Sequence, residues 1–152
     1  MATPRRRQTR LRVKMETLEW NADYATGIPE IDAQHSYLFE LTNRFIRGIL
    51  GQSEMIPLPQ LLSELSAYAR RHFSYEELLM QRAGYAHLEE HRQSHDRLSD
   101  RILQYSSEVE AGRLDPRDLA EFLRNWLKLH ILRDDMRYIP ALTSKGGNHG
   151  NA

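Results

Sequence analysis

LEEHRQSHDRL, residues 88–98, has the pattern of an amphipathic helix with histidines on its apolar face. Leu88, His91, His95 and Leu98 recur at intervals of three and four residues, which is the spacing of one helical face. The stretch therefore predicts a helix that turns two imidazoles toward the interior. Whether these imidazoles are isolated core residues or metal ligands depends on where the other histidines fall.

Three further segments carry apolar residues at the same spacing. Asp32 and Asp115 are the expected N-caps of the first and fourth helices, and Pro140 is expected to end the fourth. Four amphipathic helices joined by short loops predict an all-α, up-down-up-down four-helix bundle. The expected helices are residues 31–50, 58–83, 85–110 and 116–139.

The length and composition fit one globular domain. The chain has 152 residues, 21 Lys or Arg and 21 Asp or Glu, so its net charge gives no indication of a nucleic-acid partner. It has no cysteine, which excludes disulfides and thiolate metal sites. No apolar run is long enough to span a membrane and no secretion signal is present, so we expect a cytoplasmic protein.

The two ends differ from the middle in composition. Residues 1–14 carry six Arg or Lys and predict a flexible basic arm, and residues 141–152 predict a Gly-rich disordered tail. The bundle is expected to occupy residues 15–140. Met15 is an alternative start of translation, in which case the arm would not be part of the protein.

Each predicted helix carries at least one histidine on its apolar face. A single inward histidine is more often a hydrogen-bonded core residue than a ligand, but five in one small core form a nitrogen-rich pocket that a transition metal would stabilise. Glu76 follows His72 by four residues, and Asp134 and Asp135 follow His130, so carboxylates accompany the imidazoles. Together these groups exceed the needs of one zinc ion and suit two bridged metal ions. The inward histidines are His35, His72, His91, His95 and His130.

The chain resembles the hemerythrins, and most closely the single-domain bacteriohemerythrins. The resemblance covers about residues 20–138 and rests on WNADYATGIPEIDAQHSYLFELTN, HFSYEELLM, HRQSH and WLKLHILRDDMRY. The His-x3-Glu, His-x3-His and His-x4-Asp spacings, in this order on four helices, are specific in combination.

The resemblance implies a non-haem di-iron centre with oxo or hydroxo bridging. One iron would be bound by His91, His95 and His130, and the other by His35 and His72. Glu76 and Asp135 would bridge the two ions, although an ideal helix places Asp134, four residues after His130, on the ligand face instead. We favour Asp135 because helix ends depart from ideal geometry.

The remaining histidines and nearby acids are not expected to bind metal. His87 is expected to face solvent or to support a ligand, and His149 lies in the predicted tail. Glu77, Glu89 and Glu90 have the pattern of ordinary solvated charges.

The resemblance implies reversible dioxygen binding for carriage, storage or delivery to an oxygen-consuming enzyme, without catalysis. An apolar wall would slow the access of water and protons to the oxygen site. The alternatives are an oxygen or redox sensor and a di-iron protein that removes peroxide or nitric oxide. A monomer or small homo-oligomer is expected. The wall residues are Leu38, Phe73, Trp126, Leu127 and Ile131.

Overall fold

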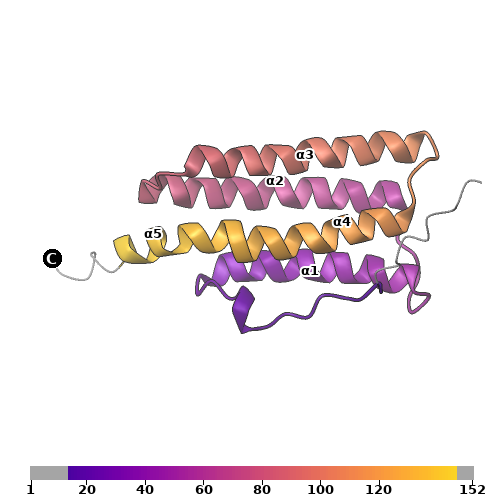
Figure 1. Ribbon diagram of the computed structural model, residues 1–152, viewed down its shortest axis with the longest axis horizontal. Coiled ribbons are helices and arrows are strands. Elements are labelled where there is room, and N and C mark those ends of the chain that lie inside the picture. The colour runs from indigo at the N-terminus through magenta and orange to yellow at the C-terminus, as the bar shows by residue number, and fades with distance from the viewer. Residues whose placement is uncertain (1–13, 147–152) are drawn as a thin grey trace, which may run out of the picture.

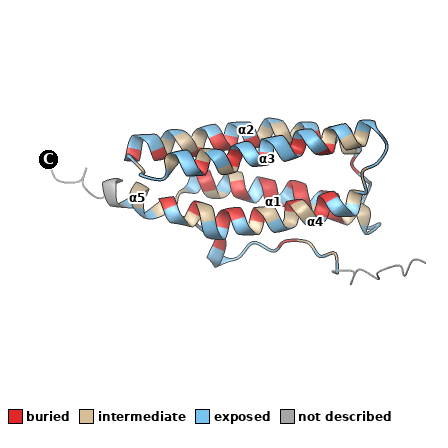
Figure 2. Cartoon of the chain, turned by 45° about the horizontal axis from the view of Figure 1, so that its top comes forward, coloured by how far each residue is buried: buried red, intermediate tan, exposed pale blue. Residues whose placement is uncertain are grey.

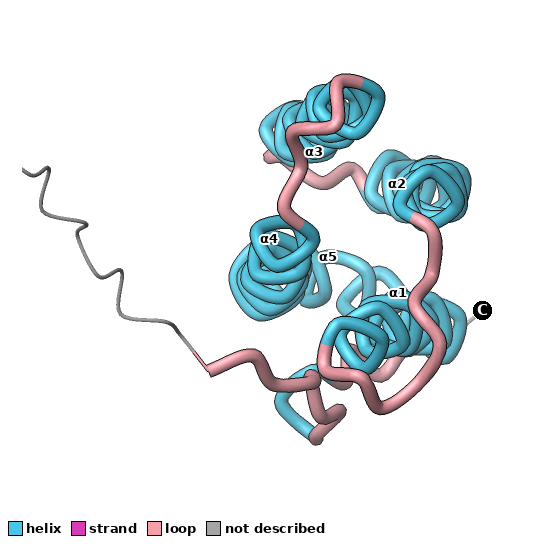
Figure 3. The backbone as a smooth tube through the Cα atoms, turned by 90° about the vertical axis from the view of Figure 1, so that its right-hand side faces the viewer, coloured by secondary structure: helices cyan, strands magenta, loops and turns pink. Residues whose placement is uncertain are grey.

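The computed structural model describes the backbone of residues 14–146 and the side chains of residues 14–143. Its helices lie alongside one another and occupy the four corners of a bundle in the end-on view (Figures 1 and 3). This confirms the predicted all-α four-helix architecture. The predicted basic arm, apart from residue 14, and the end of the predicted tail, with His149, lie outside the described residues. The elements are η1 (Ala22–Tyr24), α1 (Pro29–Ile49), α2 (Leu58–Ala83), α3 (Leu88–Glu110), α4 (Pro116–Leu129), η2 (His130–Asp135) and α5 (Met136–Gly146).

The start and stop signals in the sequence explain most helix ends. The Asp115 side chain caps α4 by accepting a hydrogen bond from the backbone N–H of Arg117. Gly84 ends α2 with a φ of 64°, in the left-handed region that favours glycine. Asp32, the predicted N-cap of α1, instead lies inside the helix, which begins at Pro29. Its carboxylate accepts hydrogen bonds from the backbone and hydroxyl of Thr26, so it orders the preceding loop. The predicted start of α3 at residue 85 was three residues early, because residues 85–87 form a turn.

The fourth helical segment (rod) of the bundle, made of α4, η2 and α5, is not one regular helix. The π-helix η2 joins α4 to α5, and α5 continues through Pro140 to Gly146. The prediction that Pro140 ends the helix is therefore wrong, and α5 extends into the first residues of the predicted tail. A proline costs one backbone hydrogen bond, but Tyr138, Ile139 and Leu142 of this segment pack with Met80 of α2, and these contacts retain the helix.

The core lies between the four rods. Buried residues follow the inward faces of the helices, while the outward faces are exposed (Figure 2). The closest helix pairs are α2 with α3 and α1 with α4. A groove separates α3 from α4 along the outer surface, and its lining comes from both helices. Among residues 14–146, no helix is both long and apolar enough to cross a membrane.

The segment before α1 is fixed along the bundle by specific polar contacts. The Leu18 backbone and the Asn43 side chain exchange two hydrogen bonds of 2.7 Å, and Arg124 of α4 donates to the carbonyl of Glu16. The described chain starts beside residues 50 and 52, at the end of α1, and α5 ends at the opposite end of the bundle (Figure 1).

Candidate metal centre

Seven buried polar side chains meet inside the bundle, nearer the end at which α1 and α3 begin. Each comes from the inward face of its element: α1 contributes one, α2 two, α3 two and η2 two. All are at most 6% exposed, so every one has been removed from water and requires a partner inside the protein. They are His35, His72, Glu76, His91, His95, His130 and Asp135.

The seven side chains form two overlapping groups that share both carboxylates. In each group one ligand atom per residue lies within 4.8 Å of the corresponding atoms of the others. Such a spacing brings the donors of one group around a common point, and the shared carboxylates place the two points side by side. The first group is Glu76, His91, His95, His130 and Asp135, and the second is His35, His72, Glu76 and Asp135.

The two oxygens of Asp135 face different groups. Its Oδ2 lies 2.9 Å from Nε2 of His35, while its Oδ1 lies 3.2 Å from Nε2 of His91 and 3.0 Å from Nε2 of His130. Asp135 therefore has the geometry of a bridge between the groups.

Glu76 also contacts both groups. Oε1 contacts Nε2 of His72 and lies 3.8 Å from Nε2 of His35 and 4.0 Å from Nε2 of His130, whereas Oε2 lies 3.7 Å from Nε2 of His91. Oε2 also accepts a 2.7 Å hydrogen bond from the hydroxyl of buried Tyr138, which fixes the orientation of the carboxylate.

The π-helix explains how His130 and Asp135 reach the same site. In a π-helix the backbone hydrogen bonds join residues five apart, so a residue and its fifth successor share a face. Asp134, which an ideal α-helix would place inward, instead lies beside the outer nitrogen of His130. Its Oδ2 is 3.6 Å from His130 Nδ1 and accepts a hydrogen bond from the Ser94 hydroxyl.

Without metal, protons reside within the cluster. Burial alone would lower the pKa of His35 and His91, but the adjacent carboxylates of Asp135 and Glu76 outweigh it and raise both pKa values to about 9. The pKa of His130 rises for the same kind of reason, with Asp135 as its main partner. Burial opposes ionisation of Asp135, yet His130 and His35 lower its pKa to about 2. Burial lowers the pKa of His95 to about 3, so this imidazole is neutral.

The available ligand atoms, imidazole nitrogens and carboxylate oxygens, fit transition metal ions. The Nε2 atoms of all five histidines are buried without a protein hydrogen bond of good geometry, as are both Asp135 oxygens and Glu76 Oε1. Buried polar atoms normally find a partner, and imidazole with carboxylate is a donor combination that iron, zinc and manganese accept. The cluster is therefore suited to binding metal.

Polar side chains that the sequence did not assign hold the outer nitrogens of two histidines. His72 Nδ1 donates to Gln34 at 2.6 Å, and His95 Nδ1 donates to Glu77 at 3.2 Å. The interpretation of Glu77 as an ordinary solvated charge was wrong, because its side chain is only 23% exposed and also binds Arg92. These contacts join different helices, so no spacing within one helix indicates them. Tyr138 was detectable, since it lies three residues after Asp135.

Two of the predicted wall residues contact histidines of the cluster. The Phe73 ring stacks on His95 with centroids 3.7 Å apart, and Trp126 stacks on His130 at 4.4 Å. Leu38, Leu127 and Ile131 are buried in the adjoining apolar core.

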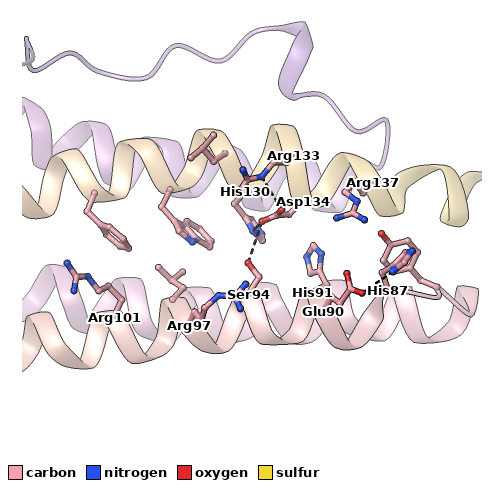
Figure 4. Close-up of a pocket in the computed structure, with 15 residues that line it drawn as sticks. His87, Glu90, His91, Ser94, Arg97, Arg101, His130, Arg133, Asp134 and Arg137 are labelled. Carbon is pink, nitrogen blue, oxygen red and sulfur yellow. Dashed lines mark hydrogen bonds and ion pairs between the residues drawn. The ribbon is translucent and has the colours of Figure 1, made fainter.

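The groove between α3 and α4 leads toward one half of the cluster. Its volume is about 440 Å³, and His91, His130 and Trp126 contribute to its lining. Figure 4 shows His91 and His130 facing each other from the two sides, with Ser94 and Asp134 joined between the helices. His87 lies at the groove's end, where it is half-exposed and contacts Glu90, so it faces solvent.

Comparison with known proteins agrees with this geometry. The family model of the hemerythrin HHE cation binding domain matches residues 26–142. A bacteriohemerythrin of Pseudomonas aeruginosa (strain LESB58) is 34% identical over 84% of this chain and 83% of its own length. One from Methylococcus capsulatus is 29% identical over 86% of this chain and 100% of its own. A crystal structure of wild-type hemerythrin superposes with a TM-score of 0.72 at 28% identity, covering 84% of this chain and 99% of that one. With the four-helix fold and the shared carboxylates, these matches show that the chain belongs to the hemerythrin family.

Proposed function

We propose that the cluster binds two iron ions and that the protein uses them to bind dioxygen reversibly. His91, His95 and His130 bind one iron, His35 and His72 bind the other, and Glu76 and Asp135 bridge them. The observation that carries this proposal is the division of the Asp135 oxygens, 2.9 Å from His35 on one side and 3.0–3.2 Å from His130 and His91 on the other.

The donor count makes the two halves unequal. The first group contributes five protein ligands and the second contributes four, counting each bridging carboxylate in both. The half-site of His35 and His72 therefore has the greater need for a small exogenous ligand, and there we place dioxygen. Two iron ions in such a centre supply reversible transfer of one electron each to dioxygen.

The chain's own contribution is to hold neutral ligands and to restrict water. The imidazoles must lose their protons to bind metal, and the two carboxylates then offset part of the metal charge inside the core. Phe73 and Trp126 cover His95 and His130 with aromatic faces, and Leu38 adds apolar surface. This environment slows the entry of water and protons while leaving dioxygen free to enter.

The first experiment is an iron count combined with visible absorption spectra. Spectra are recorded without oxygen, in air, and after the oxygen has been removed again. Two irons per chain and bands that appear in air and vanish on deoxygenation are the expected result. Bands that form once and never reverse would contradict reversible binding and favour redox sensing or removal of peroxide or nitric oxide. A protein that takes up no iron after anaerobic reconstitution would contradict the metal site itself.

A pair of variants tests the bridging assignment. Asp135→Ala removes a ligand from both half-sites, so we expect its iron content to fall well below two per chain. Asp134→Ala, one residue away, should retain two irons at saturating iron because the only contact of Asp134 with a proposed ligand is to the outer nitrogen of His130. Loss of iron from the Asp134 variant alone would show that the bridging ligand has been assigned to the wrong aspartate.

A further inference from the structure

The outer nitrogens of the cluster histidines have partners of different charge. In the half-site of His91, His95 and His130, two imidazoles face carboxylates: Glu77 lies 3.2 Å from His95 Nδ1, and Asp134 lies 3.6 Å from His130 Nδ1. In the other half-site, His72 donates to the neutral amide oxygen of Gln34, at 2.6 Å. Among the described residues, the Nδ1 atoms of His35 and His130 have no hydrogen-bond partner, so Asp134 acts on His130 through its nearby charge.

Both carboxylates are held in place from a second direction. Glu77 accepts a hydrogen bond from Arg92 at 3.1 Å, and Asp134 accepts one from the Ser94 hydroxyl at 3.4 Å. Their side chains are 23% and 26% exposed, so water screens their charges only in part. Each carboxylate therefore keeps a defined position relative to its imidazole.

A carboxylate at the outer nitrogen strengthens an imidazole as a metal ligand. Glu77 accepts the Nδ1 proton of His95, which fixes the tautomer with Nε2 free and raises the basicity of Nε2. Asp134 adds negative charge near the cation from 3.6 Å beyond His130 Nδ1. A neutral amide fixes the tautomer but adds no charge. Such outer partners typically change metal affinity by about 10- to 100-fold.

We propose that Glu77 and Asp134 are positioning residues that make the half-site of His91, His95 and His130 bind the first divalent metal ion, ahead of the half-site of His35 and His72. The proposal rests on the ligand set given under the proposed function. It adds an order of filling, which the larger donor count of that half-site also favours, and assigns part of that order to two residues outside the ligand set.

Titration of the metal-free protein with Co²⁺ tests this order, because the visible absorption of Co²⁺ depends on its ligands and separates the two sites. The unchanged chain should fill in two steps of different affinity and different spectrum. Asp134→Asn and Glu77→Gln keep the shape of the side chain but remove its charge, and each should weaken the first step about 10-fold. The second step should change little.

The reverse substitution provides the matching test. Gln34→Glu places a carboxylate against His72 and should strengthen the second step by a similar factor, which narrows the gap between the steps. Asp100→Asn removes an exposed charge from α3 without touching a histidine, and should leave both steps unchanged. The thermal unfolding of each metal-free variant is measured to show that the fold is retained.

The outcomes separate this inference from the function on which it rests. Two Co²⁺ ions bound in steps that the Asp134 and Glu77 variants leave unaltered, or weaken equally, would overturn the inference and leave the two-metal centre standing. Fewer than two ions bound at saturation by the unchanged chain would instead contradict the proposed ligand set.

Discussion

At the scale of single residues, Tyr138 shows how the centre is supported by groups that bind no metal themselves. Its ring is fully buried, and its hydroxyl donates to Glu76 Oε2 at 2.7 Å. Burial and the nearby Glu76 and Asp135 carboxylates raise the pKa of Tyr138, so the hydroxyl keeps its proton and remains a donor. A carboxylate held in this way presents a fixed oxygen toward the histidines.

Tyr138→Phe should therefore lower the stability of the metal-free protein. A hydrogen bond to a charged acceptor contributes about 2 kcal/mol, and its loss leaves one Glu76 oxygen without a donor. Urea unfolding of the metal-free chain measures the change in the free energy of unfolding. Tyr24→Phe is the matched control, because Tyr24 is also buried but its hydroxyl has no hydrogen-bond partner among the described residues. Equal losses in the two variants would assign the effect to packing.

The aromatic cover of His130 leads to a second prediction at this scale. Trp126 stacks on His130 where both line the groove, so Trp126→Ala should admit water to the centre and hasten the irreversible loss of the oxygen-dependent bands in air. Leu38→Ala should act in the same direction from the apolar core. Phe122→Ala opens the same groove away from the ligands and serves as the control. Decay rates in air that match the unchanged chain would remove these residues from any protective role.

At the scale of elements, η2 determines which aspartate enters the centre. A π turn contains one residue more than the α-helical turn it replaces, so the rod before and after it keeps its orientation toward the core. Leu132 within η2 is 42% exposed and contributes little to packing. Removing it would leave His130 and Asp135 four residues apart, which is the spacing that shares a face in a regular α-helix.

Deletion of Leu132 should consequently be tolerated. We expect the variant to form one continuous helix from α4 into α5, to bind two metal ions, and to unfold within a few degrees of the unchanged protein. Deletion of Asn125, an exposed residue of regular α4, should abolish metal binding because it turns the two parts of the rod by about 100° relative to each other. Metal stoichiometry and circular dichroism measure both results. A Leu132 deletion that behaves like the Asn125 deletion would show that the extra residue itself is required.

The same element marks the limit of prediction from sequence. Helical spacing located all four rods and the inward histidines, because both depend on residues near one another in the chain. Spacing favoured Asp134 over Asp135 because it assumes 3.6 residues per turn, and only the family resemblance pointed to Asp135. Nor could spacing identify Glu77 as the partner of His95, since that contact joins α2 to α3. The continuation of α5 through Pro140 depends on packing against α2, which local signals do not report.

At the scale of the whole molecule, the cluster makes stability depend on both pH and metal. In the metal-free chain His35 and His91 have pKa values of about 9, above the ordinary value of 6.5. Their contribution to stability is complete below about pH 6.5 and is lost as the pH rises through about 9. Metal binding removes these protons, so a metal-loaded chain no longer depends on them.

The metal-free protein should thus become less stable between pH 6.5 and pH 9, while the metal-loaded protein should not. Bound metal stabilises the native state by an amount that grows with the logarithm of the metal concentration divided by Kd. The affinity of the protein for metal also rises as protons leave the ligands. Calorimetric melting temperatures at several pH values, with and without metal, measure the difference. Parallel curves for the two forms would contradict the protonated state assigned to His35 and His91.

The placement of the first and last described residues has a use for spectroscopy. The described chain begins beside the end of α1 and finishes at the far end of the bundle (Figure 1). The 26 residues of α2 span about 39 Å along this axis. Fluorescent donor and acceptor dyes at residues 14 and 143 would be separated by nearly the full length of the molecule, with neither label near the metal ligands. Energy transfer between the dyes would then report opening of the bundle as a change in the distance between them. This signal is separate from the visible absorption of the metal centre.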